Sequence, residues 1–410
     1  MTEGSHCMYF VKRKKRFCRM TVRKGNKYCG EHQENSLDVS VGDEEIGKKR
    51  VKCPLDPRHT CYASRLSAHL KVCNAKRVID SQPSFIVKGI NVDRHCEIPS
   101  HIPLCELSQL VVDAVIDKVK AAHEKLPLFS EDVLQHKVLQ SKINDESCGR
   151  TIKKHLLQNS SLLSHLEYVG LIQDSTCFIE FGAGKGKLTY WLGQIIKDKK
   201  DSCILLVDRS SHRHKSDNKL KNEQSPLVIK RIRADIADLK LNNITEIQKF
   251  HYKVGIAKHL CGAATDLTIR CLVQAMQDEP KCNVNGLVIA FCCHHRCDYA
   301  TYIGKHYLEQ CGFTSTEFPV LCSIASWATC GSNFNKIASD QSRQNDAKDT
   351  RSGTKSLTSI EKENIGHKVK SLLNWGRLEF LKSVGFQSNL IYYTTTDVSL
   401  ENMCIIATKK

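Results

Sequence analysis

The sequence lacks any long uncharged apolar run and any apolar segment near its start. No stretch approaches the roughly 18 apolar residues that a helix needs to span a bilayer, and the N-terminus has no apolar core like that of a secretory signal. We therefore expect a soluble, intracellular protein of the nucleus, the cytoplasm or both, with no membrane partner.

Two motifs of other enzyme classes are missing as well. A Walker phosphate loop is excluded because no Gly-Lys-Ser/Thr follows the required gap. The Asn/Asp-Pro-Pro-aromatic tetrapeptide that amino-N methyltransferases of DNA usually carry is also absent. The sequence argues against both classes, and we expect no DNA partner.

Basic residues and cysteines are abundant instead. Lys and Arg number 61 against 44 Asp and Glu, and the net charge of +17 favours an anionic partner such as RNA. A merely solubilising surface charge is the alternative. The 21 cysteines would not form a disulfide framework in a reducing compartment, so metal ligation is the first explanation to test.

Four residues have the spacing of a compact zinc site. Cys53, His59, His69 and Cys73 form Cys-x5-His-x9-His-x3-Cys, and the last two share one face of a predicted helix. Two thiolates and two imidazoles suit tetrahedral zinc. Because so small a unit has little apolar core, it needs a metal or another staple to fold.

A second set, Cys7, Cys18, Cys29 and His32, follows the looser pattern Cys-x10-Cys-x10-Cys-x2-His. Unrelated free cysteines are the alternative here. Four ligands leave no open position, so we expect two structural zinc ions in all. The basic run at 12–16 and the basic residues at 19, 23, 24 and 27 are interleaved with Tyr9, Phe10, Phe17 and Tyr28, which suits phosphate contact with some stacking. A solvated charge run is equally compatible with it.

Beyond residue 168 short β-rich runs alternate with helical segments. Such alternation predicts a doubly wound, mostly parallel α/β sheet. The predicted strands are 177–180, 203–207, 227–232, 253–257, 286–290, 387–393 and 402–408, and the predicted helices are 104–126, 152–168, 187–196 and 363–383.

An acid and three alternating glycines, Glu180, Gly182, Gly184 and Gly186, follow the first of these strands. The spacing differs from the Gly-x-Gly-x-x-Gly turn that receives a pyrophosphate. S-adenosylmethionine instead brings a sulfonium and an ammonium group, which a carboxylate can face, and glycines let the backbone approach the cofactor. The turn therefore predicts a Rossmann-like class I S-adenosylmethionine-dependent methyltransferase.

Two further acids end or follow the next strands. Asp208 can bind both ribose hydroxyls of the cofactor. Asp235 can accept a hydrogen bond from the adenine amino group, or it can instead cap a helix. Asp208 in particular strengthens the prediction of a nucleoside cofactor.

The residues after the fourth and fifth strands would face the transferable methyl, because ligands bind outside the carboxyl ends of parallel strands. Methylation of a ribose hydroxyl needs a general base, or a cation that stabilises the developing oxyanion. The candidates are Lys258, His259, His294 and His295.

The same region allows two other interpretations. Cys292, Cys293, His294, His295 and Cys297 could hold a third metal ion, although adjacent ligands converge poorly on one ion. Alternatively, the thiols pack as small apolar groups while the histidines line a cleft.

The motifs and the composition divide the chain into five segments. They are a Cys3His-type zinc finger at 1–36, a linker at 37–50, a Cys-His-His-Cys zinc finger at 51–79, a helical connector at 80–150, and a methyltransferase domain at 151–410 with an insertion at 333–362. The insertion is rich in Ser, Asn, Asp, Lys and Gln, and we expect it to be disordered.

Both finger spacings, the turn at 180–186, Lys258-His259-Leu260-Cys261-Gly262 and Cys292-Cys293-His294-His295 together resemble one family. The chain is similar to the eukaryotic tRNA 2′-O-ribose methyltransferases that modify the fourth nucleotide of the acceptor stem. The resemblance implies transfer of a methyl from S-adenosylmethionine to a 2′-hydroxyl of cytidine or adenosine in tRNA. It also implies zinc at both fingers, the second of which resembles an RNA-contacting finger of a minor-spliceosome protein.

Two other functions remain open from the sequence. One is a zinc-finger RNA-binding adaptor, for instance in splicing, that retains a non-catalytic methyltransferase fold; the intact Glu180, glycines and Asp208 argue against it. The other is a protein methyltransferase of a related Cys-Cys-His group, which the fingers and their basic surroundings disfavour. The sequence does not identify protein partners.

Overall fold

The computed structural model describes residues 6–11, 15–22, 25–29, 32, 50–93, 99–100, 102–213, 215–222, 227–278, 282–330 and 357–409. The chain forms two compact units, Met1–Pro83 (unit 1) and Ser84–Lys410 (unit 2). The predicted linker, except residue 50, most of the predicted insertion, and residues 12–14 of the basic run lie outside the described residues.

Unit 1 consists of short elements around two hairpins. Strands β1 (Phe10–Val11) and β2 (Arg16–Phe17) pair antiparallel, as do β3 (Arg50–Cys53) and β4 (Asp56–Tyr62). A 3-10 turn (Ala63–Arg65) leads into α1 (Leu66–Val72) and α2 (Asn74–Asp80). Among the described residues of this unit, the buried hydrophobic side chains are all cysteines: Cys7, Cys29, Cys53, Cys61 and Cys73.

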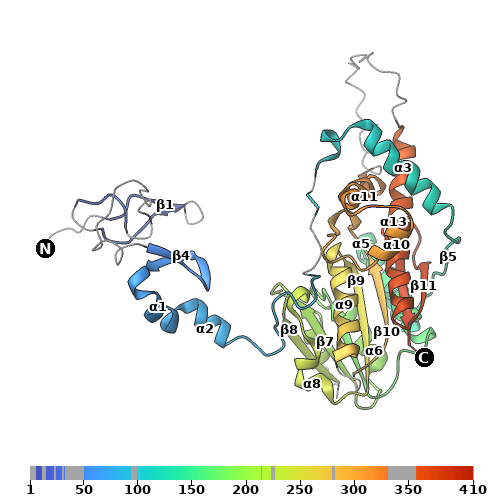
Figure 1. The fold of residues 1–410 in the computed structure, drawn as a ribbon. Helices are drawn as coiled ribbons and strands as arrows, with labels where there is room; N and C mark the ends of the chain where they lie inside the picture. Colours follow the sequence, from blue (N-terminus) through green and yellow to red (C-terminus); the bar gives the residue numbers. More distant parts are fainter. Residues whose placement is uncertain are drawn as a thin grey trace. The chain divides into compact units, whose positions relative to one another are not determined.

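Unit 2 is built on one eight-stranded sheet in the order β5-β11-β12-β10-β9-β6-β7-β8 (Figure 1). Neighbours from β8 to β10 are parallel, whereas β12 runs antiparallel to both β10 and β11. The strands are β5 (Ser130–Glu131), β6 (Thr176–Phe181), β7 (Cys203–Asp208), β8 (Val228–Arg233), β9 (Tyr252–Leu260), β10 (Asn283–Phe291), β11 (Gln387–Tyr392) and β12 (Met403–Thr408).

The central strands are apolar on both faces because helices cover both faces. Phe178 of β6 belongs to the apolar cluster beneath α5 (Arg150–Tyr168) and α6 (Lys187–Ile196). Its neighbour Ile179 belongs to the cluster beneath α9 (Ala263–Asp278). Burial on both sides is typical of parallel strands and explains their continuous hydrophobic runs.

A third apolar cluster joins α3 (Gln109–His123), α11 (Phe318–Ala325) and α13 (Ser359–Ser383). The segment predicted as a helical connector thus packs α3 into unit 2, and it also contributes β5 at the sheet edge. The end of the predicted insertion differs from expectation, because residues 359–362 form the first turn of α13. A capping box between Thr358 and Glu361 begins that helix.

The remaining helical elements are short. They are a 3-10 turn (Leu104–Glu106), α4 (Lys137–Ile143), α7 (Asp217–Asn222), 3-10 turns at Ile236–Asp238 and Leu241–Asn243, α8 (Thr245–Gln248), a 3-10 turn (His294–Arg296), α10 (Lys305–Gln310), a 3-10 turn (Ser315–Glu317) and α12 (Trp327–Cys330). Within the described ranges, no helix combines the length and the apolar character needed to cross a membrane.

Candidate functional site

The four residues of the looser cysteine pattern lie together. Cys7, Cys18, Cys29 and His32 each offer one ligand atom, and these atoms lie within 4.8 Å of one another. The Nδ1 atom of His32 is 3.4 Å from the Sγ atoms of both Cys7 and Cys29. The Cys18 N–H donates to the Tyr9 carbonyl at 2.8 Å, which fixes the backbone around the site. Three thiols and one imidazole at this separation fit tetrahedral zinc.

The four residues of the Cys-His-His-Cys pattern also lie together. Strands β3 and β4 supply Cys53 and His59, while α1 supplies His69 and leads into Cys73. All four ligand atoms lie within 4.8 Å of one another, with 3.9 Å between the Sγ atoms and 3.1 Å between the Nε2 atoms. A carboxylate oxygen of Asp56 lies 3.7 Å from Nδ1 of His59, where it can orient a metal-bound imidazole.

The predicted glycine turn connects β6 to α6. Gly182, Gly184 and Gly186 have φ angles of 65°, 51° and 69°, which L side chains rarely adopt. A Cβ at Gly182 would lie 2.9 Å from Leu260, and one at Gly186 would lie 2.6 Å from an Asp217 oxygen. At Gly184 the nearest atom would be 4.0 Å away, so this part of the turn has room for a ligand beside the backbone.

Glu180 is almost completely buried and bonds to α6. One of its carboxylate oxygens accepts from the Thr189 N–H at 3.0 Å and from the Thr189 hydroxyl. Burial raises the pKa of Glu180 to about 7, although the hydrogen bonds from Thr189 oppose the shift. A cation bound nearby would favour the ionised carboxylate.

Asp208 ends β7 and Asp235 follows the neighbouring β8, at the same edge of the sheet. Asp208 accepts from the backbone N–H groups of Gly184 and Ser210, each at 2.7 Å. Asp235 caps a 3-10 turn by accepting from the Ala237 N–H at 3.0 Å, which corresponds to the capping alternative. Both carboxylates therefore border the glycine turn or the loop beside it, and neither is fully buried.

An ion pair that the sequence did not indicate supports the turn. Arg231 of β8 donates to the Gly184 carbonyl at 2.9 Å and to Asp217 at 2.7 Å. The Asp217 side chain is 1% exposed, so its charge depends on this arginine. No local pattern identifies the pair, because its two residues lie in separate elements.

Lys258 projects from the end of β9 toward α5. Its Nζ atom donates to Asn159 Oδ1 at 2.7 Å and to the His155 carbonyl at 3.1 Å. Burial, together with the positive charge of Lys187, lowers the pKa of Lys258 to about 7, and Glu180 opposes the shift. An amine with this pKa is partly neutral at physiological pH and can accept a proton.

His259 has a left-handed backbone with φ of 57°. Its Nε2 atom lies 2.9 Å from Oε1 of Gln158, which is buried in α5. Helix α5 therefore holds both candidates of this strand end, through residues that sequence reasoning missed. His295 is exposed in the turn after β10.

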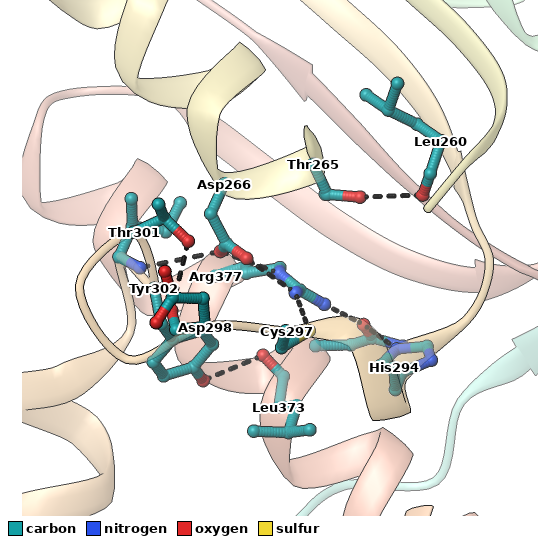
Figure 2. Close-up of polar contacts among 12 residues, drawn as sticks. Leu260, Thr265, Asp266, His294, Cys297, Asp298, Thr301, Tyr302, Leu373 and Arg377 are labelled. Carbon is teal, nitrogen blue, oxygen red and sulfur yellow. Dashed lines mark hydrogen bonds and ion pairs between the residues drawn. The ribbon is translucent and has the colours of Figure 1, made fainter. Parts of the chain in front are cut away.

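The other candidate, His294, lies in a buried polar network (Figure 2). Its Nε2 atom is 2.7 Å from Asn374 Oδ1, which also accepts from Arg377 at 2.9 Å. Arg377 forms two bonds with Asp266, at 2.9 and 2.8 Å, and lies 3.0 Å from the Cys297 sulfur. Burial holds the pKa of His294 well below its usual range. These contacts support the turn after β10, and a catalytic role of His294 stays a prediction.

These contacts separate the residues of the suggested third metal cluster. His294 and Cys297 belong to the buried network. Cys292 and Cys293 instead approach Cys261, and the three Sγ atoms lie within 4.8 Å of one another. The five residues do not converge as one set, in line with the poor convergence expected of adjacent ligands.

The fold and site together define the class of protein. Five parallel strands, an antiparallel β12 between β10 and β11, and a glycine turn followed by acids on the next strands constitute a class I S-adenosylmethionine-dependent methyltransferase. Residues 157–408 match the family model described as Methyltransferase TRM13. Residues 5–33 match the CCCH zinc finger in TRM13 protein, and 50–74 match the U11-48K-like CHHC zinc finger. The chain belongs to the TRM13 methyltransferase family.

Relatives match along almost the whole chain. The tRNA:m(4)X modification enzyme TRM13 homologs of Mus musculus and Homo sapiens are each 36% identical to it, over 98% of this chain and 94% of theirs. TRM13 of Saccharomyces cerevisiae is 30% identical over 100% of this chain and 97% of its own. Among solved structures, magnesium protoporphyrin IX methyltransferase from Synechocystis is 11% identical, covers 67% of this chain and 93% of its own, and has a TM-score of 0.32.

The family resemblance and the class I fold inferred from the sequence are confirmed, as are S-adenosylmethionine and structural zinc as the cofactors. The individual cofactor-binding and catalytic residues remain predictions, which the geometry above makes specific.

Proposed function

We propose that this protein transfers a methyl group from S-adenosylmethionine to a ribose 2′-hydroxyl of tRNA, on cytidine or adenosine at the fourth position of the acceptor stem. Family membership and the names of relatives as tRNA:m(4)X modification enzymes support tRNA as the substrate. The main support for methylation of a 2′-hydroxyl is the position and lowered pKa of the Lys258 amine at the carboxyl end of β9.

In this proposal Lys258 is the general base. S-adenosylmethionine supplies an electrophilic methyl on its sulfonium. Asn159 and the His155 carbonyl hold the Lys258 Nζ atom, and its neutral form accepts the 2′-hydroxyl proton as the oxygen attacks the methyl carbon. S-adenosylhomocysteine would be the leaving group of this transfer. His259, fixed by Gln158, positions the strand end beside Lys258.

The cofactor would lie along the carboxyl edge of β6, β7 and β8. The glycine turn would admit it, and Asp208 and Asp235 would accept from its ribose hydroxyls and adenine amino group. Glu180 would face its cationic part in the ionised form. These assignments explain why an acid stands at or just after the end of each of the three strands, with Asp208 bonded to the glycine turn.

A basic cleft on the same helix supports an RNA substrate. The first turns of α5 carry Arg150, Lys153 and Lys154, which line a cleft with Asp397 and Val398. Cations of this kind contact phosphates and set the register of a nucleic acid. The cleft begins on the helix that holds Lys258, so RNA bound there would run toward the proposed base.

Unit 1 offers stacking surfaces for RNA. Tyr9, Phe10 and Phe17 are 46%, 47% and 61% exposed, beside the cations Arg16 and Arg19. Exposed rings among cations suit unpaired bases and phosphates. We also propose an intracellular location, in the nucleus or the cytoplasm, where reducing conditions keep zinc-binding thiols available.

The test is mass spectrometry of nucleosides from unmodified tRNA incubated with the full chain and S-adenosylmethionine. We expect 2′-O-methylated cytidine or adenosine, mapped to the fourth nucleotide by nuclease fragments. A base-methylated nucleoside would contradict the 2′-hydroxyl chemistry. Absence of measurable S-adenosylmethionine binding by calorimetry would instead favour the RNA-binding adaptor.

The Lys258→Ala variant tests the base. We expect its single-turnover rate to fall by about 10²–10⁴-fold, the usual contribution of general base catalysis, with cofactor affinity unchanged. Lys249→Ala is the matched control, because Lys249 is an exposed lysine outside the site. Full activity of Lys258→Ala would exclude the proposed role.

A further inference from the structure

Three cysteines meet at the carboxyl ends of β9 and β10. The Cys261 and Cys293 Sγ atoms are 3.5 Å apart, and those of Cys292 and Cys293 are 3.3 Å apart. All three atoms lie within 4.8 Å of one another, the same limit that the two finger sites meet. Cys261 comes from the neighbouring strand end, so only two ligands are adjacent in sequence.

These thiols do not serve as apolar filling. Each of them is only partly buried. The buried cysteines of the described part of unit 2 are Cys148, Cys177, Cys203, Cys271, Cys282, Cys322 and Cys404. Partly exposed thiols that converge at a strand end are available as ligands, because the thiolate is the form that binds a metal.

The backbone keeps the two strand ends together. Gly262 has φ of 52°, and a Cβ there would lie 2.3 Å from the Arg296 carbonyl oxygen. The loop after β9 and the turn after β10 therefore touch backbone to backbone, which only glycine permits. This contact brings Cys261 against Cys293 before any ion binds.

A nitrogen donor adjoins the thiols. The His259 side chain is near enough to Cys292 to oppose the rise in the pKa of that thiol. Its Nε2 atom faces Gln158 Oε1, an acceptor, and in the tautomer that donates to this oxygen Nδ1 carries the lone pair. A metal-binding histidine typically donates its other ring N–H to an oxygen in this way.

We propose that Cys261, Cys292 and Cys293 bind a third zinc ion, beside His259 and separate from the two finger sites. Binding replaces three thiol protons, which pass to solvent, by one Zn²⁺. Three thiolates and Zn²⁺ leave one net negative charge, which nearby Arg296 offsets. Three thiolates make the zinc ion a weak Lewis acid. We therefore propose a structural role, in which the ion holds the ends of β9 and β10 together next to Lys258.

Zinc content of the full chain tests the site. We expect three zinc ions per chain by elemental mass spectrometry after purification under reducing conditions, and two in the Cys261→Ser/Cys293→Ser double variant. Cys105→Ser is the matched control, because Cys105 is exposed and outside every cluster of the described residues, and it should retain three. Two ions in the unaltered chain, or the same number in the double variant, would overturn the site.

A second measurement does not require a variant to fold. With zinc bound, Cys261, Cys292 and Cys293 should resist alkylation, and removal of zinc by a chelator should expose all three while Cys105 reacts in both states. Equal labelling with and without zinc, or a Cys261–Cys293 disulfide in the purified protein, would overturn the proposal. Neither measurement depends on methyl transfer, so failure of this inference is distinct from failure of the proposed function.

Discussion

Unit 1 and unit 2 bury different kinds of side chain. Among the described residues, unit 1 buries cysteines and leaves Met8, Phe17 and Val72 more than half exposed, at 62%, 61% and 64%. Unit 2 buries three large apolar clusters on and beside its sheet. A structure without apolar burial needs another source of free energy, and metal ligation supplies it here. Folding of unit 1 therefore depends on zinc, whereas folding of the sheet of unit 2 does not.

The largest expected effect follows from removing zinc. Structural zinc contributes about 10–16 kcal/mol of apparent binding free energy in finger peptides at neutral pH. We expect chelation to remove hydrogen-exchange protection from 50–74 of the full chain while β6 and β7 remain protected. Protection of 50–74 at zero zinc content would remove the contrast between the units.

The contrast between local and long-range contacts also explains which features could be predicted from the sequence. Ligand spacing, the glycine turn and apolar strand runs are local patterns, and each was predicted. The partners of Lys258 were not, because Asn159 lies 99 residues away and nothing in α5 marks it as a partner. The partners of the cluster at 292–297 were not predicted either, for the same reason. Its members turn toward Cys261 and Arg377, which only the sheet topology brings near.

The next effect concerns polar groups inside unit 2. Arg377 and Asp266 are 1% and 0% exposed, and the arginine also supports Asn374. Removal of one partner of a buried pair typically destabilises by about 3–5 kcal/mol, because the remaining charge is left unpaired. We expect this loss for Arg377→Leu in urea unfolding followed by the fluorescence of unit 2.

Lys382→Ala is the control on the same helix. Lys382 and Glu379 form an ion pair with side chains 46% and 39% exposed, and such pairs contribute about 0–1 kcal/mol. If Arg377→Leu and Lys382→Ala lowered the free energy of unfolding by similar amounts, burial would not be what makes the Arg377–Asp266 pair important.

A smaller effect should appear in the pH dependence of methyl transfer. Burial lowers the pKa of Lys258 to about 7, and only the neutral amine can act as base. We expect the single-turnover rate to rise about tenfold per unit below pH 7 and to level above it. A rate that is flat between about pH 6 and 8 would mean that this amine does not accept the proton.

The smallest expected change is at the start of α13. Thr358 accepts from the Glu361 N–H at 3.2 Å, and Glu361 accepts from the Thr358 N–H at 2.7 Å. Loss of such a cap costs about 1 kcal/mol, a modest effect because Leu372, Leu373 and Leu378 anchor the helix in apolar clusters. Thr358→Ala should therefore lower the free energy of unfolding by about 1 kcal/mol, and Ser359→Ala, which alters no cap, should not. A much larger loss would mean that α13 depends on its cap as unit 1 depends on zinc, and that apolar packing does not suffice to hold it.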